Sequence, residues 1–185
     1  MIDEVLGELR QRMVRSVEVL QEDLMSIRTG RASPALVEKL QVEYYGTMTS
    51  LNQMASIAAP EPRLLVIRPW DTSALHEIER AILKSDLGLT PMNDGKLIRL
   101  NIPRLTEERR RELVKVVARR VEEARVAIRN LRRDALQDLK DFEKEKMISE
   151  DDFFRGKEKV QELTDEFIEQ IDEIGKRKEA EVMEI

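Results

Sequence analysis

The side chains that most often perform chemistry in enzymes are scarce in this sequence. It contains no cysteine and a single histidine, His76. Disulfides, thiolate nucleophiles, cysteine-ligated metals and a histidine-rich metal site within one chain are therefore excluded. No serine or cysteine motif accompanies His76, and a lone histidine is better explained as a surface or structural residue than as a general base. We expect no catalytic residue, no metal and no cofactor.

The acidic pairs and the glycines also have explanations that involve no catalysis. Glu107 and Glu108, like Asp151 and Asp152, stand where helices are predicted to begin, and the helix dipole favours negative charge there. A phosphate-binding loop needs several glycines at close, fixed spacing, whereas Gly88 and Gly95 are isolated. The sequence Asn93-Asp94-Gly95 instead predicts a turn. An enzyme is a poor interpretation of this chain.

The pattern with the most chemical content is a set of arginines. At about 100° per residue, Arg125, Arg129 and Arg132 fall on one flank of a predicted helix, within about 60° of each other. Guanidinium groups bind phosphate oxygens bidentately and stack on bases, so such a stripe suits a nucleic-acid backbone. The alternative is a solvated helix face whose charges pair with an acidic neighbouring helix. The spacing alone leaves both interpretations open.

The charge of the chain is distributed unevenly along its 185 residues. The total is −5, but residues 104–133 carry 11 Lys/Arg and 5 Asp/Glu, a net of +6, whereas residues 134–185 carry 9 and 18, a net of −9. An anionic partner is therefore possible at one face only. Charged residues make up 37% and aromatic residues 4% of the chain, which favours long solvated helices with narrow apolar seams over a thick core.

Three long helices are predicted to carry these charges. Apolar residues recur every three or four positions from residue 2 to 27, from 113 to 142 and from 153 to 182. The first helix, of about 27 residues, is expected to end at Gly30, and the second, of about 40, to begin at an N-cap Thr106. A capping box at Ser149 and Asp152 is expected to start the third. The second helix should exceed the first by roughly 20 Å, with the overhang away from the linkers.

The segment between the first two helices is predicted to form a small β/α/β domain. Residues 40–45, 55–59, 64–68 and 97–102 have the composition or alternation of strands, and residues 71–85 return to a helical pattern. We therefore predict an α+β fold in which residues 1–30 and 105–185 form a three-helix bundle and residues 31–104 an inserted domain. Two linkers at one end make a hinge, which we assign to Gly30, Arg31, Ala32, Arg104 and Leu105.

The amino-terminal sequence and the hydropathy of the chain predict a cytoplasmic protein. The amino-terminal sequence MIDEVLGELRQRM is acidic and amphipathic, which is typical of neither a signal peptide nor an arginine-rich transit peptide. No run of 18 apolar residues is present, so no membrane span is expected.

Several short motifs resemble those of the bacterial ribosome recycling factors. They lie in order along most of the chain, at the length usual for the family: IRTGRASP at 27–34, VEYYG at 42–46, SDLGL at 85–89, LTEERR at 105–110, AIRNLRRDA at 127–135 and ISEDD at 148–152. The proline-rich stretch at 59–62 departs from the pattern and leaves the conformation of that loop open.

The resemblance implies an L-shaped arrangement of a three-helix bundle and a β/α/β domain, in a monomer that catalyses no bond change. Such factors enter the ribosome after termination and, with elongation factor G and GTP, split it into subunits. The family places large-subunit ribosomal RNA against the bundle, and the resemblance assigns Arg110, Arg129 and Arg132, with Arg28 and Arg31 near the hinge, to that contact surface. Together with Arg125 and Arg133 of the same helix, these are the residues expected to bind RNA. The competing interpretation is a non-ribosomal helical adaptor or chaperone-like protein whose arginine face is only solvated.

Overall fold

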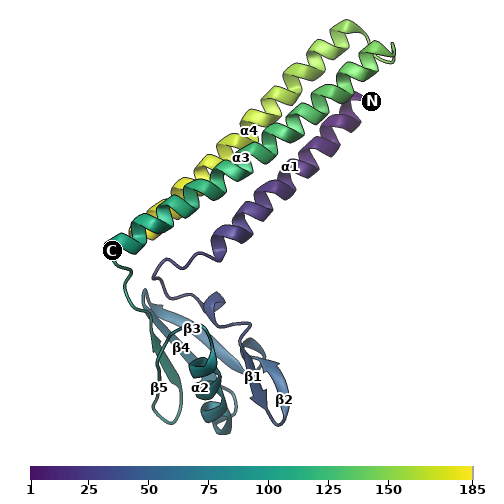
Figure 1. Cartoon of the computed structure of the whole chain (residues 1–185). Coiled ribbons are helices and arrows are strands. Elements are labelled where there is room, and N and C mark those ends of the chain that lie inside the picture. Colours follow the sequence, from purple (N-terminus) through teal and green to yellow (C-terminus); the bar gives the residue numbers. More distant parts are fainter. Residues whose placement is uncertain (185) are drawn as a thin grey trace. The chain divides into compact units, whose positions relative to one another are not determined.

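The structure, a computed structural model, describes residues 1–184. The chain forms two compact units, each with a core of its own. One consists of Met1–Thr29 together with the segment from Thr106 onward, and the other is Gly30–Leu105. The first unit is helical and the second contains the strands (Figure 1). This architecture confirms the predicted α+β fold, a long three-helix bundle with a small β-rich insertion.

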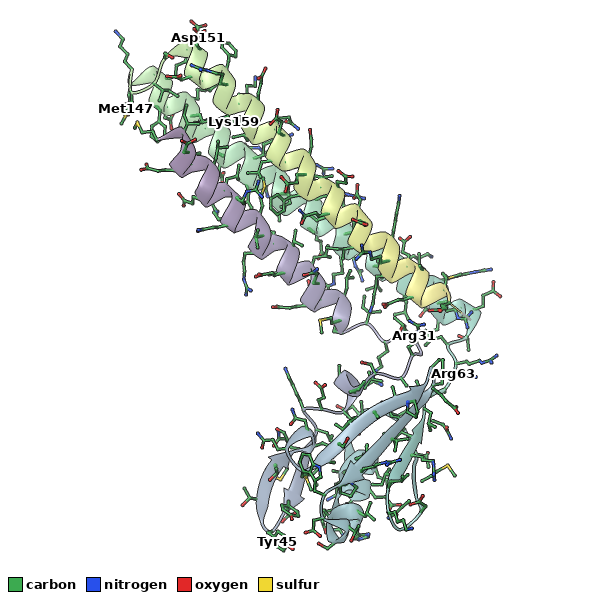
Figure 2. All side chains as sticks on the ribbon, turned by 180° about the vertical axis from the view of Figure 1, so that it is seen from behind. Arg31, Tyr45, Arg63, Met147, Asp151 and Lys159 are labelled. Carbon is green, nitrogen blue, oxygen red and sulfur yellow. The ribbon has the colours of Figure 1, made fainter. Side chains whose placement is uncertain are left out.

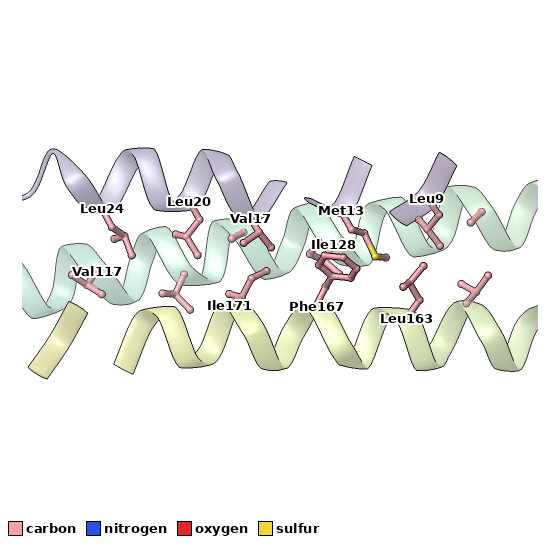
Figure 3. Packing of buried hydrophobic residues seen from close by; sticks show 14 of the residues in the cluster. Leu9, Met13, Val17, Leu20, Leu24, Val117, Ile128, Leu163, Phe167 and Ile171 are labelled. Atoms are coloured by element: carbon pink, nitrogen blue, oxygen red, sulfur yellow. The ribbon is translucent and has the colours of Figure 1, made fainter. Parts of the chain in front are cut away.

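The helical unit consists of α1 (Ile2–Met25), α3 (Glu107–Lys144) and α4 (Glu150–Met183). The three helices lie side by side in an up-down-up order, each turning one apolar stripe toward the other two (Figures 1 and 3). Removing these stripes from water stabilises helices that are otherwise highly charged. The buried core residues are Leu9, Met13, Val17, Leu20, Leu24, Val117, Val121, Ala124, Ile128, Ala135, Leu139, Val160, Leu163, Phe167 and Ile171.

Side-chain caps start the two longest helices where the sequence predicted them. The hydroxyl of Thr106 accepts a hydrogen bond from the backbone N–H of Arg109 at 3.1 Å. The Ser149 hydroxyl accepts from the N–H of Asp152 at 3.0 Å, and the Asp152 carboxylate accepts in return from the N–H of Ser149. Each cap satisfies donors that have no partner within the helix. The predicted capping box is confirmed, with Asp in the place of Glu.

The first helix is shorter than predicted, because α1 ends at Met25 instead of reaching Gly30. The backbone N–H of Ile27 bonds to the Leu24 carbonyl, three residues back, at 3.1 Å, so the helical pattern of bonds four residues apart has ended by Ile27. Gly30 does adopt a left-handed φ of 77°, but in the linker. The predicted overhang is also corrected: Leu24 lies at the level of Val117, so α3 extends past α1 at the linker end as well (Figure 3).

The inserted unit contains two antiparallel sheets, one α-helix and three short 3-10 helices. The first sheet is a hairpin of β1 (Gln41–Tyr44) and β2 (Thr47–Ser50). The second has the order β3-β4-β6-β5, formed by β3 (Ala55–Glu61), β4 (Leu64–Pro69), β5 (Pro91–Asn93) and β6 (Ile98–Asn101). Helix α2 (Leu75–Lys84) buries Leu75, Ile78 and Ile82 in the same core as the strands.

Two strands were missed by the sequence analysis, and both are short. β2 and β5 contain few buried residues and little alternation, and each exists because a turn folds it back on a stronger partner. Tyr45 and Gly46 both have positive φ in the two-residue turn that joins β1 to β2. The expected turn before β6 is present: Asn93 accepts a hydrogen bond from the N–H of Gly95, whose φ is 89°.

The proline-rich stretch at 59–62 is part of an edge strand. The register of β3 against β4 shifts between Ala58 and Glu61, which accommodates Pro60, a residue without a backbone N–H. The turn that follows β3 accepts backbone hydrogen bonds from segments near both ends of the inserted unit. The Pro62 carbonyl accepts from the N–H of Ala32 at 2.6 Å, and the Arg63 carbonyl accepts from the N–H of Ile102 at 2.8 Å.

None of the helices within residues 1–184 combines the length and the apolar character that a membrane crossing requires.

Candidate nucleic-acid interface

The predicted arginine stripe lies on α3, along its border with α4. α4 packs antiparallel to α3, so the early part of one helix faces the late part of the other (Figures 1 and 2). The arginines of α3 therefore face residues of α4 that are far away in sequence. Their side chains are held by groups from both helices, and the three predicted members of the stripe are held in different ways.

Arg125 is the most firmly held guanidinium of the stripe. Its Nε donates to Asp172 Oδ1 on α4 at 2.8 Å, and a second nitrogen approaches the same oxygen at 2.6 Å. A third nitrogen lies 3.0 Å from Glu122 Oε2. Hydrogen bonds to Asp172 and Glu122 raise the pKa of Arg125 against the opposing effect of partial burial. This arginine is fixed by two carboxylates.

Arg129 and Arg132 are held less firmly. Arg129 donates to Glu122 Oε1 at 3.1 Å, and no other residue among 1–184 accepts from its side chain. Arg132 donates to the neutral amide oxygen of Gln161 on α4, at 3.4 Å. Within the described chain, Arg133 has neither an ion pair nor a hydrogen bond from its side chain, which is exposed. The carboxylate partners thus decrease along α3 toward its C-terminal end.

Glu122 was not singled out from the sequence, yet it contacts two of the three arginines of the stripe. Each of its carboxylate oxygens faces a different guanidinium, those of Arg125 and Arg129. Hydrogen bonds from Arg125 and Arg129 lower the pKa of Glu122, so it is ionised at neutral pH. Its spacing of three and seven residues from these arginines is the signal that could have identified it, because such positions share one helix face.

The structure therefore combines the two interpretations that the sequence left open. Arg125 pairs with the acidic helix α4 through Asp172, as the solvated-face interpretation predicted. Arg129 pairs within its own helix, and Arg132 and Arg133 have no carboxylate partner among residues 1–184. Guanidinium groups without a carboxylate partner remain available to an anionic ligand.

The other predicted RNA-binding arginines lie outside this cluster. Arg110 is in the first turn of α3, about four helical turns before Arg125. Its side chain is partly buried and has no ion pair within the described part of the chain. Arg28 belongs to the helical unit, after the end of α1, and Arg31 belongs to the inserted unit. Both make contacts of their own.

The structure also shows the surroundings of the other residues that were considered for chemistry. His76 lies on the surface of α2, where its Nε2 is 3.2 Å from a guanidinium nitrogen of Arg80. Across residues 1–184, no group of three or more His, Cys, Asp or Glu side chains has the arrangement of a metal site. Asp152 acts as the predicted helix cap, and Ser149 and Arg155 lower its pKa.

Comparison with known proteins gives one consistent result along the whole chain. A family model described as "Ribosome recycling factor" matches residues 20–183. The ribosome-recycling factor of Carboxydothermus hydrogenoformans is 59% identical over 185 residues, which is 100% of both chains. That of Roseiflexus sp. (strain RS-1) is 58% identical, also over the full length of both.

Two solved structures extend the similarity to the fold. One, described as the solution structure of the ribosome recycling factor, has a TM-score of 0.77 at 41% identity and covers 100% of this chain and 98% of that one. The other has a TM-score of 0.66 at 50% identity and covers 99% of each chain. Its description is of models for the T. thermophilus ribosome recycling factor and the E. coli elongation factor G bound to the E. coli post-termination complex.

Proposed function

The chain belongs to the ribosome recycling factor family, and from that premise we propose that it recycles ribosomes after termination. It binds the post-termination ribosome and, with elongation factor G and GTP, promotes its dissociation into subunits and the release of mRNA and tRNA. The observation that carries this proposal is a sequence identity of 57–59% to several ribosome-recycling factors over the complete chain. The helical-adaptor alternative has no comparable support.

In this function the chain acts by binding and not by catalysis, and its place is the cytoplasm, where ribosomes are. GTP is hydrolysed by the partner factor, and the recycling factor itself changes no covalent bond. The scarcity of nucleophiles and the surface position of His76 support a role without bond chemistry.

We propose that the arginine face of α3 contacts large-subunit ribosomal RNA. Arg132 and Arg133 are its primary phosphate ligands, because no carboxylate of residues 1–184 holds them. Arg125 and Arg129 extend the face along the same helix, and Arg110 lies nearer its start. Arg28 and Arg31 complete the proposed set near the linkers.

We also propose that the two linkers act as a hinge between bundle and insertion. Gly30, Arg31, Ala32, Arg104 and Leu105 lie at or beside the two boundaries between the compact units. A Cβ at Gly30 would lie 3.3 Å from Leu105 Cγ, so the two linkers touch here. Because the N–H of Ala32 is bonded to Pro62, rotation is expected mainly at the residues before Ala32.

Subunit splitting tests the function directly. Purified protein is mixed with post-termination ribosomes, elongation factor G and GTP, and the subunits are separated on a sucrose gradient. Free subunits should appear only when both factors and GTP are present. Ribosomes that stay intact under these conditions, with an active factor from another source as positive control, contradict the proposal.

The variant Arg132→Glu tests the RNA contact. The reversal should weaken binding to isolated large subunits about tenfold or more, since a charge-assisted hydrogen bond is replaced by repulsion. The dependence of log affinity on log salt concentration should also become less steep by roughly one, because binding with one fewer phosphate contact releases fewer counterions. The matched control is Arg120→Glu, the same charge change on the α1 side of α3, where Arg120 pairs with Glu123. Equal effects of the two variants would refute a specific contact at Arg132.

A further inference from the structure

Glu122 is the acidic residue that occupies the proposed RNA-binding face. It lies between two arginines, 3.0 Å from a nitrogen of Arg125 through one oxygen and 3.1 Å from a nitrogen of Arg129 through the other. The two carboxylate oxygens thereby accept hydrogen bonds from the two arginines, as two oxygens of a phosphate group would. The face therefore contains an anion of its own.

The two arginines depend on Glu122 to different degrees. Arg125 has a second carboxylate partner in Asp172, and only 31% of its side chain is exposed. Arg129 has Glu122 alone as a partner within residues 1–184, and 48% of its side chain is exposed. An external anion can replace Glu122 at Arg129 while Arg125 keeps its bond to α4.

The pair is also exposed enough to exchange. Glu122 itself is 51% exposed, and ion pairs at such positions are individually weak because water and salt screen them. Its hydrogen bonds from Arg125 and Arg129 keep its pKa low, so the carboxylate stays charged and does not leave the site by protonation near neutral pH. The guanidinium of Arg129 is therefore freed when this exposed pair opens, and a second anion can then take the place of Glu122.

We propose that Glu122 is an affinity-limiting residue that competes with RNA phosphate for Arg129. The inference rests on the proposed function and deepens it, because it concerns how tightly the same face holds its ligand. Binding requires the exchange of the Glu122 contact at Arg129 for a phosphate contact. Such an internal competitor favours dissociation from the ribosome after each round, because the Glu122 carboxylate can pair with Arg129 again when the phosphate leaves.

The test is Glu122→Gln, compared with Glu123→Gln. Both remove one negative charge from adjacent positions of α3, but Glu123 pairs with Arg120 and lines a groove beside α1, away from the stripe. Affinity for isolated large ribosomal subunits is measured by sedimentation or filter binding at several salt concentrations between about 50 and 200 mM. Circular dichroism and thermal unfolding establish that both variants remain folded.

Glu122→Gln should tighten binding about two- to fivefold, the range that the energy of an exposed ion pair represents. It should also steepen the salt dependence by roughly one, because Arg129 gains a phosphate contact. Glu123→Gln should change neither quantity to that extent. Equal effects of the two variants would show that only the change in net charge affects binding, and would overturn the inference. Weaker binding by Glu122→Gln would also overturn it, since Glu122 would then be needed to position the arginines.

These outcomes are distinct from a failure of the proposed function. If the unaltered protein does not bind large subunits at low salt, the function itself is wrong. If it binds and the two glutamine variants behave alike, the function stands and only the role of Glu122 is lost.

Discussion

Asp71 connects the β1–β2 hairpin to the start of α2 through hydroxyl groups. One of its carboxylate oxygens accepts from the hydroxyl of Tyr44 at 2.8 Å and, at 3.4 Å, from that of Tyr45. The other accepts from the hydroxyl and the N–H of Ser73. The bond to Asp71, followed by burial, raises the pKa of Tyr44 from 10.0 to about 12, and the bonds from Ser73 and Tyr44 lower the pKa of Asp71.

At the residue scale, Tyr44→Phe should destabilise the inserted unit more than Tyr45→Phe. The Tyr44 hydroxyl makes the short bond, whereas Tyr45 is 81% exposed and its hydroxyl lies at the limit of hydrogen-bonding distance. Thermal unfolding at pH 7 measures the difference. The same midpoint for both variants would show that the Tyr44 bond adds nothing to stability.

The pKa shifts also fix the direction of the pH dependence. Because the folded-state pKa of Tyr44 is raised, its contribution is fully present below about pH 10 and is lost as the pH rises toward about 12. Because the pKa of Asp71 is lowered, its contribution is present above the ordinary carboxyl range and is lost in acid. Unfolding midpoints of Tyr44→Phe should therefore decline less between pH 9 and 12 than those of the unaltered protein.

At the scale of elements, two glycines of α4 set how closely it approaches α3. A Cβ at Gly175 would lie 2.7 Å from Val121 Cγ2, a short branched side chain that has little room to move. At Gly156 the nearest atom would be Leu139 Cδ1 at 3.0 Å, the end of a more adaptable side chain. Of these two positions, Gly175 therefore leaves less room for a side chain.

Gly175→Ala should destabilise the bundle by about 1–3 kcal/mol, the usual cost of overpacking a filled core. This loss should exceed the gain of up to about 1 kcal/mol that alanine brings to a helix interior. Gly7→Ala is the matched control, because a Cβ there would meet no atom within 4 Å on the exposed side of α1. It should stabilise by roughly 0.5–1 kcal/mol. Denaturant unfolding measures both, and stabilisation by Gly175→Ala would contradict the close-approach argument.

At the scale of the whole molecule, two hydrophobic cores imply two unfolding events. The cluster built on Phe167 and Ile128 belongs to the bundle, and the cluster built on Ile67 and Ile78 belongs to the insertion. Only two lengths of backbone join the units. Domains with separate cores generally unfold as separate units unless a large interface couples them.

Calorimetry should therefore resolve two transitions that respond to different substitutions. Gly175→Ala should lower only the transition of the bundle, and Tyr44→Phe only that of the insertion. A single transition that both variants shift by similar amounts would indicate that the units are energetically coupled. Near-ultraviolet circular dichroism assigns the events, because both tyrosines and Trp70 lie in the insertion.

Features that depend on residues close together along the chain could be predicted from the sequence alone. The periodicity of the three helices, the caps at Thr106 and Ser149 and the turn before Gly95 involve residues at most four positions apart. The order of short motifs was sufficient to indicate the family, which the comparisons confirm. The end of α1 was placed too late, because the prediction took Gly30 as the residue that ends the helix, whereas the helix ends at Met25 and Gly30 lies in the linker.

Contacts between residues that are distant in sequence could be found only in the tertiary structure. Asp172 lies 47 positions from Arg125, and Gly175 lies 54 from Val121, so no spacing rule connects them. The strands β2 and β5 exist through pairing and not through propensity. The pairing of Arg125 with Asp172 also depends on the tertiary structure, because the strength of a charge pair depends on the distance and exposure that the facing helix imposes. The sequence located the arginine stripe, and the structure showed that Arg125 pairs with a carboxylate of α4, whereas Arg129 pairs with Glu122 of its own helix.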